Sequence, residues 1–386
     1  MDKTNLREVI RRREYNEGNP YDVLRERDYL PILKMNDGTP VTRENWRERR
    51  KELVELLEKY SYGRYRKPEI KKLWGKFISS EGESCCAGKC SHEKVNVFFE
   101  TEEYGVAGFP IDIYTPKEIE RPPVFLHIAF GKVPAKYIPV EEICDNGFAL
   151  CVLDYQEMVK DVHRVFPGVL GEYFNVTAEN RGPEDWGKIG MWAWGASRVL
   201  DYIIDYRPDL DGERVAVIGH SRLGKTALWC GAMDERFAAV ISNDSGYGGA
   251  ASSKFGTGEQ AWIFNRYGSW CWFCENFKLF DYELENNKPY DQSFLLALVA
   301  PRYLLVGSAE LDDGADPESE FLTTLHASSV WELLGEKGLV VGDKMPKPGD
   351  RFGDGNVQYH IRRHRHYLAR EDWGAYMTFL KEKFKK

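Results

Sequence analysis

No stretch of the 386-residue sequence approaches the roughly 20 consecutive apolar residues that a membrane-spanning helix requires. The first residues, MDKTNLREVIRRREYNEG, are charged throughout and lack the apolar core of a secretory signal peptide. A basic excess is also missing, because 53 Lys and Arg face 61 Asp and Glu and give a net charge of -8. Phosphate binding needs a basic surface, so we expect a protein that does not bind nucleic acid. Because the sequence shows neither a signal peptide nor a membrane span, we also expect it to be cytoplasmic and not to bind a membrane. The oligomeric state stays open.

The eight cysteines show no spacing typical of a metal site. Most lie inside apolar runs, as Cys144, Cys151 and Cys230 do, where cysteine is usually a small core residue. One group has a histidine beside it: Cys85, Cys86, Cys90 and His92. Its C-C-x3-C-x-H spacing lacks the C-x2-C geometry and the second ligand pair of a zinc site. We interpret this group as a loop and expect neither a metal nor a cofactor.

Short apolar runs alternate with amphipathic segments through most of the chain. Residues 1–40 are polar and turn-rich, and a helix is expected from about residue 44 to residue 60. Alternating runs between residues 94 and 116 predict an antiparallel hairpin, after which strands and helices alternate. This order predicts an α/β fold with a mostly parallel sheet and helices on both faces. We expect residues 1–75 to form an N-terminal arm and helix packed on the main domain, 76–386, as one domain overall.

The stretch RVAVIGHSRLGKTALW, which begins at Arg214, contains a buried strand, a sharp turn and the start of a helix. Ser221 lies in that turn, as the nucleophile does in the strand-to-helix elbow of an α/β-hydrolase. The usual pattern is G-x-S-x-G, whereas Leu223 takes the place of the second glycine and Gly224 follows it. The alternative is a plain turn in which Ser221 only caps the helix.

Reactive side chains follow the later strands in the order serine, acid, histidine, which is the order of the α/β-hydrolase fold. Ligands of open α/β sheets lie beyond the carboxyl ends of the strands. The residues at these ends are Ser221, Asp244, Glu310, Asp312, Asp313, His360, His364 and His366. A serine needs an imidazole to take its proton, and the imidazole needs a carboxylate to orient it. The backbone N–H of Arg222 and the loop at Phe130 and Gly131 are available as oxyanion donors.

Six ordered motifs resemble carbohydrate esterase family 15, the glucuronoyl esterases, and their bacterial relatives. They are GHSRLGK, ISNDSGYGGAA, WCWFCENF, LLALVAPR, SAELDDGADPESEF and YHIRRHRHYLAREDW. The resemblance covers most of the chain from about residue 30 and implies an α/β-hydrolase catalytic domain with a Ser-His-acid triad and no metal.

The resemblance also implies roles for individual residues. Ser221 matches the nucleophile and His366 the triad histidine, with His360 as the runner-up. Arg222 matches an arginine that places its guanidinium in the oxyanion hole. Lys225 matches a lysine that contacts sugar hydroxyls, and Glu259 matches a second sugar contact.

Two positions depart from a single family pattern. Fungal members have a glutamate where this chain has Asp244, and many bacterial members use a carboxylate that matches Asp312. This sequence has both, and we favour Asp312 because Asp244 is shorter than a glutamate. The family's sugar-stacking tryptophan corresponds to Gly314, which removes one wall of the expected uronate pocket.

These observations predict a serine carboxylesterase acting on a small or oligosaccharide ester, most simply an ester of glucuronic acid. An acetyl xylan esterase or another uronate methyl esterase would use the same triad. A non-catalytic carbohydrate-binding protein with a decayed hydrolase fold is the alternative from another class.

Overall fold

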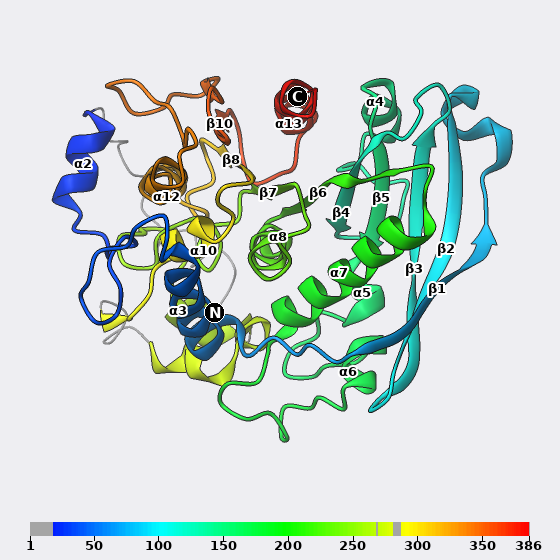
Figure 1. Cartoon of the computed structure of the whole chain (residues 1–386), viewed down its shortest axis with the longest axis horizontal. Helices are drawn as coiled ribbons and strands as arrows, with labels where there is room; N and C mark the ends of the chain where they lie inside the picture. The colour runs from blue at the N-terminus through cyan, green and yellow to red at the C-terminus, as the bar shows by residue number, and fades with distance from the viewer. Residues whose placement is uncertain (1–17, 268, 281–286, 386) are drawn as a thin grey trace.

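The centre of the computed structural model, which describes residues 18–267, 269–280 and 287–385, is a ten-stranded sheet (Figure 1). Its strand order is β1-β2-β3-β5-β4-β6-β7-β8-β10-β9. The strands are β1 (Ile70–Ser79), β2 (Cys90–Thr101), β3 (Gly105–Pro116), β4 (Pro123–Ala129), β5 (Ala149–Asp154), β6 (Asp211–His220), β7 (Ala239–Asn243), β8 (Tyr303–Ala309), β9 (Arg351–Phe352) and β10 (Val357–Arg362). From β5 to β10 all neighbours are parallel, while β1, β2, β3 and β9 pair antiparallel at the two ends. The expected α/β-hydrolase arrangement is confirmed.

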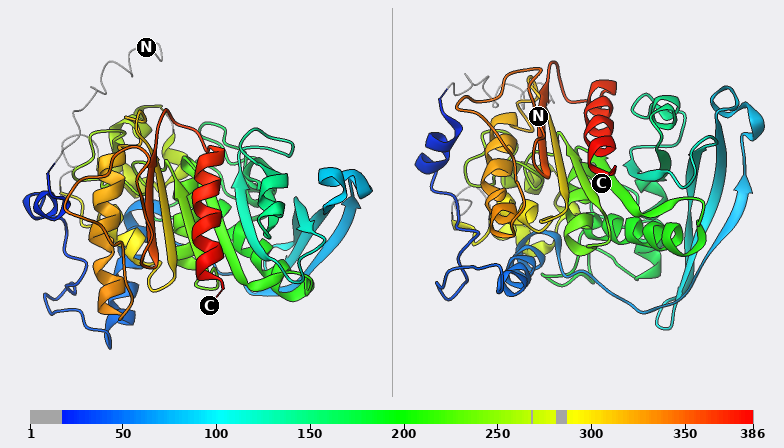
Figure 2. Two further views of the ribbon diagram at one scale, coloured as in Figure 1. Left: turned by 90° about the horizontal axis from the view of Figure 1, so that it is seen from above. Right: turned by 45° about the horizontal axis from the view of Figure 1, so that its top comes forward.

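Helices cover both faces of this sheet. α4 and α13 lie on one face and α7 and α8 on the other (Figure 1; two further views in Figure 2). The helices are α2 (Pro20–Glu26), α3 (Trp46–Leu57), α4 (Val140–Asp145), α5 (Tyr155–Met158), α6 (Val169–Tyr173), α7 (Lys188–Tyr206), α8 (Arg222–Met233), α9 (Ala261–Tyr267), α10 (Gln292–Ala297), α11 (Pro317–Ala327), α12 (Ser329–Leu333) and α13 (Arg370–Lys383). No helix among the described residues is long and apolar enough to span a bilayer.

The central strands are apolar on both sides because each side has its own core. Phe125 in β4 packs on Trp373 of α13, with ring centroids 5.4 Å apart. On the opposite face the larger core contains Trp192 of α7 and Trp229 of α8, both fully buried. The sheet is therefore held rigidly from both sides, and its carboxyl edge can position side chains for chemistry.

The N-terminal boundary expected at residue 75 needs a correction. It falls inside β1, which pairs with β2 from Ile70 to Ser79 and so belongs to the sheet. The sequence IKKLWGKFIS was not recognised as a strand because most of its side chains are exposed, which weakens its apolar alternation. Of the expected arm, residues 1–17 lie outside the described part, and α3 packs against α10.

Candidate active site

Ser221 occupies a strained turn between β6 and α8. Its φ of 58° and ψ of -129° lie where side chains other than glycine are uncommon. Its backbone N–H donates to the carbonyl of Asn243 at 2.9 Å, which ties the turn to the next strand. The hydroxyl makes no capping hydrogen bond to α8. The helix-cap alternative is therefore wrong, and the geometry is that of an elbow.

Glycines allow the two close approaches that this turn requires. A Cβ on Gly219 would lie 2.0 Å from the carbonyl oxygen of Leu223, so no larger residue fits there. At Gly224 a Cβ would lie 3.0 Å from the Cβ of Ser245 and 3.2 Å from the Asn243 carbonyl oxygen. The glycine shifted by one place thus lets α8 approach the end of β7, while Leu223 fills the core.

An imidazole and a carboxylate meet beside this elbow. Nδ1 of His366 lies 2.6 Å from Oδ2 of Asp312, and the imidazole remains partly exposed. Asp312 comes three residues after β8, whereas His366 lies in the turn between β10 and α13. An Nδ1–H that donates to this carboxylate leaves Nε2 as the basic nitrogen. His220, next to Ser221, lies close by, with its ring centroid 4.4 Å from that of His366.

Asp244 has a different partner. Its Oδ2 accepts a hydrogen bond from Arg362 at 3.0 Å, and its Oδ1 has no hydrogen-bond partner among the described groups. Arg362 is shared, because its Nε donates to Asp372 at 2.7 Å. Burial, with the charges of Asp312 and Asp372, raises the pKa of Asp244 well above its usual value. Asp244 is therefore placed to hold Arg362, and Asp312 holds His366.

The other histidines near this edge are occupied elsewhere. His360, the runner-up base, is buried and lies 2.8 Å from Asp372 through Nε2. His220 bonds Asn243 through Nδ1 at 2.7 Å, and burial, with the nearby His366, lowers its pKa to about 3, so it is neutral. Ligand atoms of His220, Asp244 and His366 lie within 4.8 Å of one another, as a metal site requires. A cation there would meet the Arg362 guanidinium already paired with Asp244.

A basic run such as Arg362 to His366 usually forms a solvated loop, but Arg362 departs from this expectation. Its side chain is buried and donates to the backbone carbonyls of Arg363, Arg365 and Tyr367. These bonds fold the turn that presents His366. A planar guanidinium with five donors suits such a role because it can hold several acceptors at once.

Arg222 is held beside Ser221 by residues that the sequence did not single out. Its guanidinium pairs with Asp161 and lies over the rings of Trp272 and Phe130, at 4.5 and 5.4 Å from their centroids. The Trp272 Nε1–H donates to the other Asp161 oxygen at 2.7 Å. Asp161 follows β5 and α5 near the same edge of the sheet. Functional side chains were sought only at the carboxyl ends of the later strands, and the same search after β5 would have singled out Asp161.

Lys225 and Glu259 form a second polar group near the elbow. Nζ of Lys225 lies 3.6 Å from Oε2 of Glu259, and it also donates to the Ser245 carbonyl. Lys225 is buried, which lowers its pKa, while Glu259 is half-buried. Glu320 of α11 accepts hydrogen bonds from the backbone N–H groups of Ser245 and Gly246, and so holds the loop that follows β7.

Gly314 lies next to this pair. The Glu259 N–H donates to its carbonyl at 2.9 Å. A Cβ built on Gly314 would meet only ordinary contacts, 3.7 Å from Oδ1 of Asp312 and 4.0 Å from Cγ of Glu259. A Cβ at position 314 would therefore meet no clash.

A serine in an elbow, followed along one sheet by an acid and a histidine that bond to each other, defines the α/β-hydrolase class. Comparisons with known proteins place the chain more closely. Residues 101–335 match the family described as glucuronyl esterase, fungi. The carbohydrate esterase MZ0003, from an unknown prokaryotic organism, is 32% identical over 90% of this chain and 87% of its own length. The 4-O-methyl-glucuronoyl methylesterase of Schizophyllum commune is 28% identical over 78% of this chain and 72% of its own.

Solved structures agree with these matches. The glucuronoyl esterase from Solibacter usitatus superposes with a TM-score of 0.83 and 34% identity, over 92% of this chain and 97% of that one. A promiscuous esterase of the same family, from a marine bacterial metagenome, gives a TM-score of 0.80 and 31% identity, over 92% and 96%. The chain belongs to carbohydrate esterase family 15, the glucuronoyl esterases, and is a carboxylic ester hydrolase.

Proposed function

We propose that the protein hydrolyses esters of a glucuronic acid residue, with Ser221 as nucleophile, His366 as base and Asp312 as the triad acid. The observation that carries this proposal is the 2.6 Å contact between His366 and Asp312 beside the Ser221 elbow. Relatives of this chain include glucuronoyl esterases, among them a 4-O-methyl-glucuronoyl methylesterase.

The reaction proceeds in two halves. Ser221 Oγ attacks the ester carbonyl carbon while its proton moves to Nε2 of His366, and Asp312 stabilises the imidazolium. Backbone N–H groups of Arg222 and of the Phe130–Gly131 loop, with the Arg222 guanidinium, stabilise the oxyanion. The carbon–oxygen bond to the alcohol breaks, and His366 protonates the leaving oxygen. Water then attacks the acyl-enzyme, gives its proton to His366, and releases the uronic acid and Ser221.

The polar group beside the elbow fits the sugar half of this substrate. Lys225 and Glu259 offer a donor and an acceptor to sugar hydroxyls, and Lys225 lies in the first turn of α8, four residues after Ser221. A hydroxyl-rich glucuronoyl group matches these residues better than a small acetyl group does, because it offers them several hydrogen-bonding hydroxyls.

A side-by-side assay tests the proposal. We expect turnover of benzyl glucuronate to exceed that of acetylated xylo-oligosaccharide and of p-nitrophenyl acetate in kcat/KM. An acetyl xylan esterase would show the reverse order. That second activity is favoured by Gly314, since the site lacks the ring that stacks on the sugar in relatives. A preference for the acetylated oligosaccharide would reject the uronate assignment and keep the triad.

Replacing Gly314 by tryptophan is expected to lower the KM for benzyl glucuronate about threefold to tenfold. The backbone accepts a Cβ at this position, and the new ring would offer a flat apolar surface to the sugar, a contact of roughly 0.5–1.5 kcal/mol. Steady-state kinetics on benzyl glucuronate and p-nitrophenyl acetate will measure it. The acetate, which has no sugar ring, is the control and should keep its KM. An equal change in both substrates would show that Gly314 does not border the sugar site.

Replacing Asp161 by asparagine should lower kcat about tenfold to a hundredfold and change KM less. Asparagine can still accept from Trp272 but no longer balances the Arg222 charge, so the guanidinium loses its position beside the oxyanion. Asp185→Asn, which removes a half-exposed partner of Arg66, is the matched control. A thermal melt accompanies both, because Asp161 also lies 3.9 Å from buried Lys188. Loss of stability with kcat intact would contradict the role.

A further inference from the structure

The carboxylate of Glu320 in α11 is fully buried and accepts four hydrogen bonds. Its Oε1 accepts from the backbone N–H of Ser245 at 2.8 Å, from the Ser245 hydroxyl at 3.3 Å and from the N–H of Gly246 at 2.9 Å. Its Oε2 accepts from the Ser308 hydroxyl in β8 at 2.6 Å. A buried carboxylate costs free energy unless donors satisfy it. Here the donors tie α11 to the loop after β7 and to the end of β8.

A single peptide unit lies between Glu320 and Lys225. The Gly246 N–H donates to Glu320, and the Ser245 carbonyl accepts from Nζ of Lys225. These two backbone groups belong to the same peptide bond, between residues 245 and 246. In a planar trans peptide bond they point in opposite directions. The carboxylate on one side therefore aims the carbonyl at the ammonium group on the other side.

Gly246 makes the orientation of this peptide unit depend on its partners. Its φ is 58°, and a Cβ at this position would lie 2.9 Å from Cα of Ala315. Glycine adopts positive and negative φ about equally well, so the backbone alone does not fix the orientation. If the peptide turned over, its carbonyl would face the carboxylate of Glu320 and its N–H would face Lys225, and both contacts would be repulsive. An ionised Glu320 therefore selects the orientation that the structure has.

Lys225 would lose an acceptor if the peptide turned over. Its buried Nζ also lies 3.6 Å from Oε2 of Glu259. A buried ammonium group needs acceptors, so loss of the Ser245 carbonyl would displace it. Glu259 would be disturbed as well, because its Oε2 lies 3.5 Å from the position of a Cβ built on Gly246. A change at Glu320 therefore reaches both residues assigned to the sugar.

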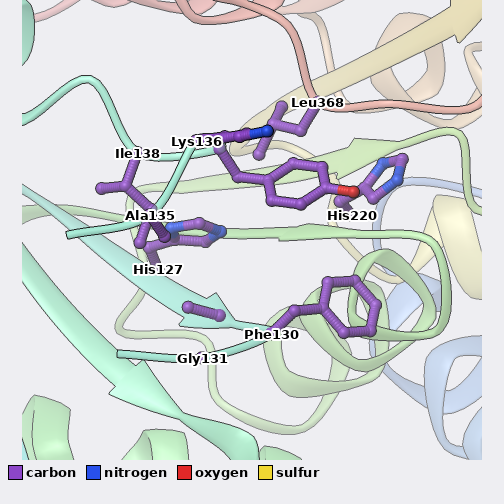
Figure 3. A pocket seen from close by; sticks show the side chains of 10 residues that line it. His127, Phe130, Gly131, Ala135, Lys136, Ile138, His220 and Leu368 are labelled. Carbon is purple, nitrogen blue, oxygen red and sulfur yellow. The ribbon is translucent and has the colours of Figure 1, made fainter. Parts of the chain in front are cut away.

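The oxyanion side of the site is built from other residues. The Phe130–Gly131 loop borders a cavity of about 250 Å³ beside His220, and the walls of this cavity include His127 and Leu368 (Figure 3). These residues come from the end of β4, the end of β6 and the turn before α13. A change at Glu320 is therefore expected to spare the oxyanion donors of this loop and to act on substrate binding more than on the chemical step.

We propose that Glu320 is a positioning residue for the sugar half of the substrate: its ionised carboxylate orients the 245–246 peptide unit, which holds the ammonium group of Lys225 where it meets sugar hydroxyls. The inference rests on the proposed function, because that function gives Lys225 its role. Glu320 then favours a glucuronate ester over an acetate ester without touching either substrate.

The charge of Glu320 depends on pH near neutrality. Burial, with the charge of Asp312, raises its pKa to about 7, although the hydrogen bonds from Ser308, Gly246 and Ser245 oppose this rise. The charged groups near it on the other elements are Asp244, Asp312, Lys225 and Glu259. Above this pKa the carboxylate is ionised and holds the peptide unit. As the pH falls through the pKa, Glu320 takes up a proton and the orientation is released.

The ratio of two specificity constants measures this effect in the wild type. We divide kcat/KM for benzyl glucuronate by kcat/KM for p-nitrophenyl acetate, so that the titration of His366, which both reactions need, cancels. The ratio is expected to fall about fivefold to tenfold between about pH 8 and about pH 6, because only the sugar ester uses Lys225. This measurement needs no variant.

Glu320→Gln keeps the shape of the side chain and removes its charge. Its amide can accept from the Gly246 N–H or donate to a reversed carbonyl, so the orientation is no longer selected. The KM for benzyl glucuronate should rise about tenfold, with kcat within about threefold and kcat/KM for p-nitrophenyl acetate within about twofold. The ratio should then be low and independent of pH. Glu318→Gln, at a buried partner of Arg27 on the same helix, is the matched control and should behave like the wild type.

The outcomes separate the role of Glu320 from the proposed function. An equal loss on both substrates in Glu320→Gln, or an unchanged KM for benzyl glucuronate, would overturn the positioning role. A ratio that does not change with pH in the wild type would overturn it even if the variant fails to fold. If Asp244→Asn rather than Glu320→Gln abolishes the pH dependence, Asp244 is the titrating group. If the wild type cleaves the acetate but not benzyl glucuronate, the proposed function has failed, and the role of Glu320 falls with it.

Discussion

Replacing Ser221 by alanine is expected to lower kcat by a factor of about 10⁴ to 10⁶, the range found when a triad serine is removed. The reason is chemical, because alanine has no nucleophile for the ester carbonyl, and only oxyanion binding remains. Alanine has the same Cβ as serine, so the backbone strain at φ 58° is unchanged and the fold should persist. Initial rates on benzyl glucuronate, with circular dichroism of the same preparation, will measure both effects.

A fluorophosphonate probe gives an independent measure of the same residue. It should label the wild type at Ser221 and leave the alanine variant unlabelled, because the probe reacts only with a serine activated by an imidazole. Ser84→Ala, at an exposed serine, is the control and should label and turn over like the wild type. Unchanged activity in Ser221→Ala, or no labelling of the wild type, would reject the serine mechanism and favour a non-catalytic hydrolase-fold protein.

The fold could be predicted in most of its parts because the central strands are buried on both faces and read as continuous apolar runs. β1 could not, since it lies at the sheet edge with most of its side chains in solvent. The helical region from residue 317 to residue 333 is divided into α11 and α12 at Ser328, whose hydroxyl donates to the Thr324 carbonyl and accepts from the Leu339 N–H. Tertiary contacts of this kind are not encoded in local periodicity.

The residues of the candidate site could be predicted from the sequence because the carboxyl ends of parallel strands lie at the same edge of the sheet. Ser221, Asp312 and His366 could be named because each follows a strand or a turn at that edge. Their supports were harder to find. Asp161 contacts Arg222, which is 61 positions further along the chain, and Arg362 contacts Asp244, which is 118 positions before it. The sequence contains no spacing that reports such distances.

The choice between two carboxylates shows the same limit. Asp244 and Asp312 follow adjacent strands, β7 and β8, and both could reach a histidine beyond β10. What separates them is Arg362, which is buried at the end of β10 and pairs with Asp244. Asp312 has no arginine partner among the described residues and bonds His366 instead. A charged side chain that looked like part of a solvated loop thus decides which acid is available.

Replacing Asp312 by asparagine should therefore lower kcat about 10³- to 10⁴-fold, while Asp244→Asn should cost less than about tenfold. Asparagine at 312 cannot stabilise the imidazolium and favours the wrong tautomer of His366, a change worth roughly 10⁴ in a related triad. Asparagine at 244 can still accept from Arg362 through its amide oxygen. Because burial already raises the pKa of Asp244, removing its charge changes the site little.

The pair of variants is informative because each is the control for the other. Both substitutions are isosteric, both positions are buried, and both lie at the same edge of the sheet. Initial rates on benzyl glucuronate across a range of pH, with thermal melts, separate a lost triad acid from a damaged turn. Weakening of the Arg362 contacts in Asp244→Asn would appear as a lower melting temperature with kcat nearly retained. Full activity in Asp312→Asn with loss in Asp244→Asn would reverse the assignment, and equal activity in both variants would reject the triad.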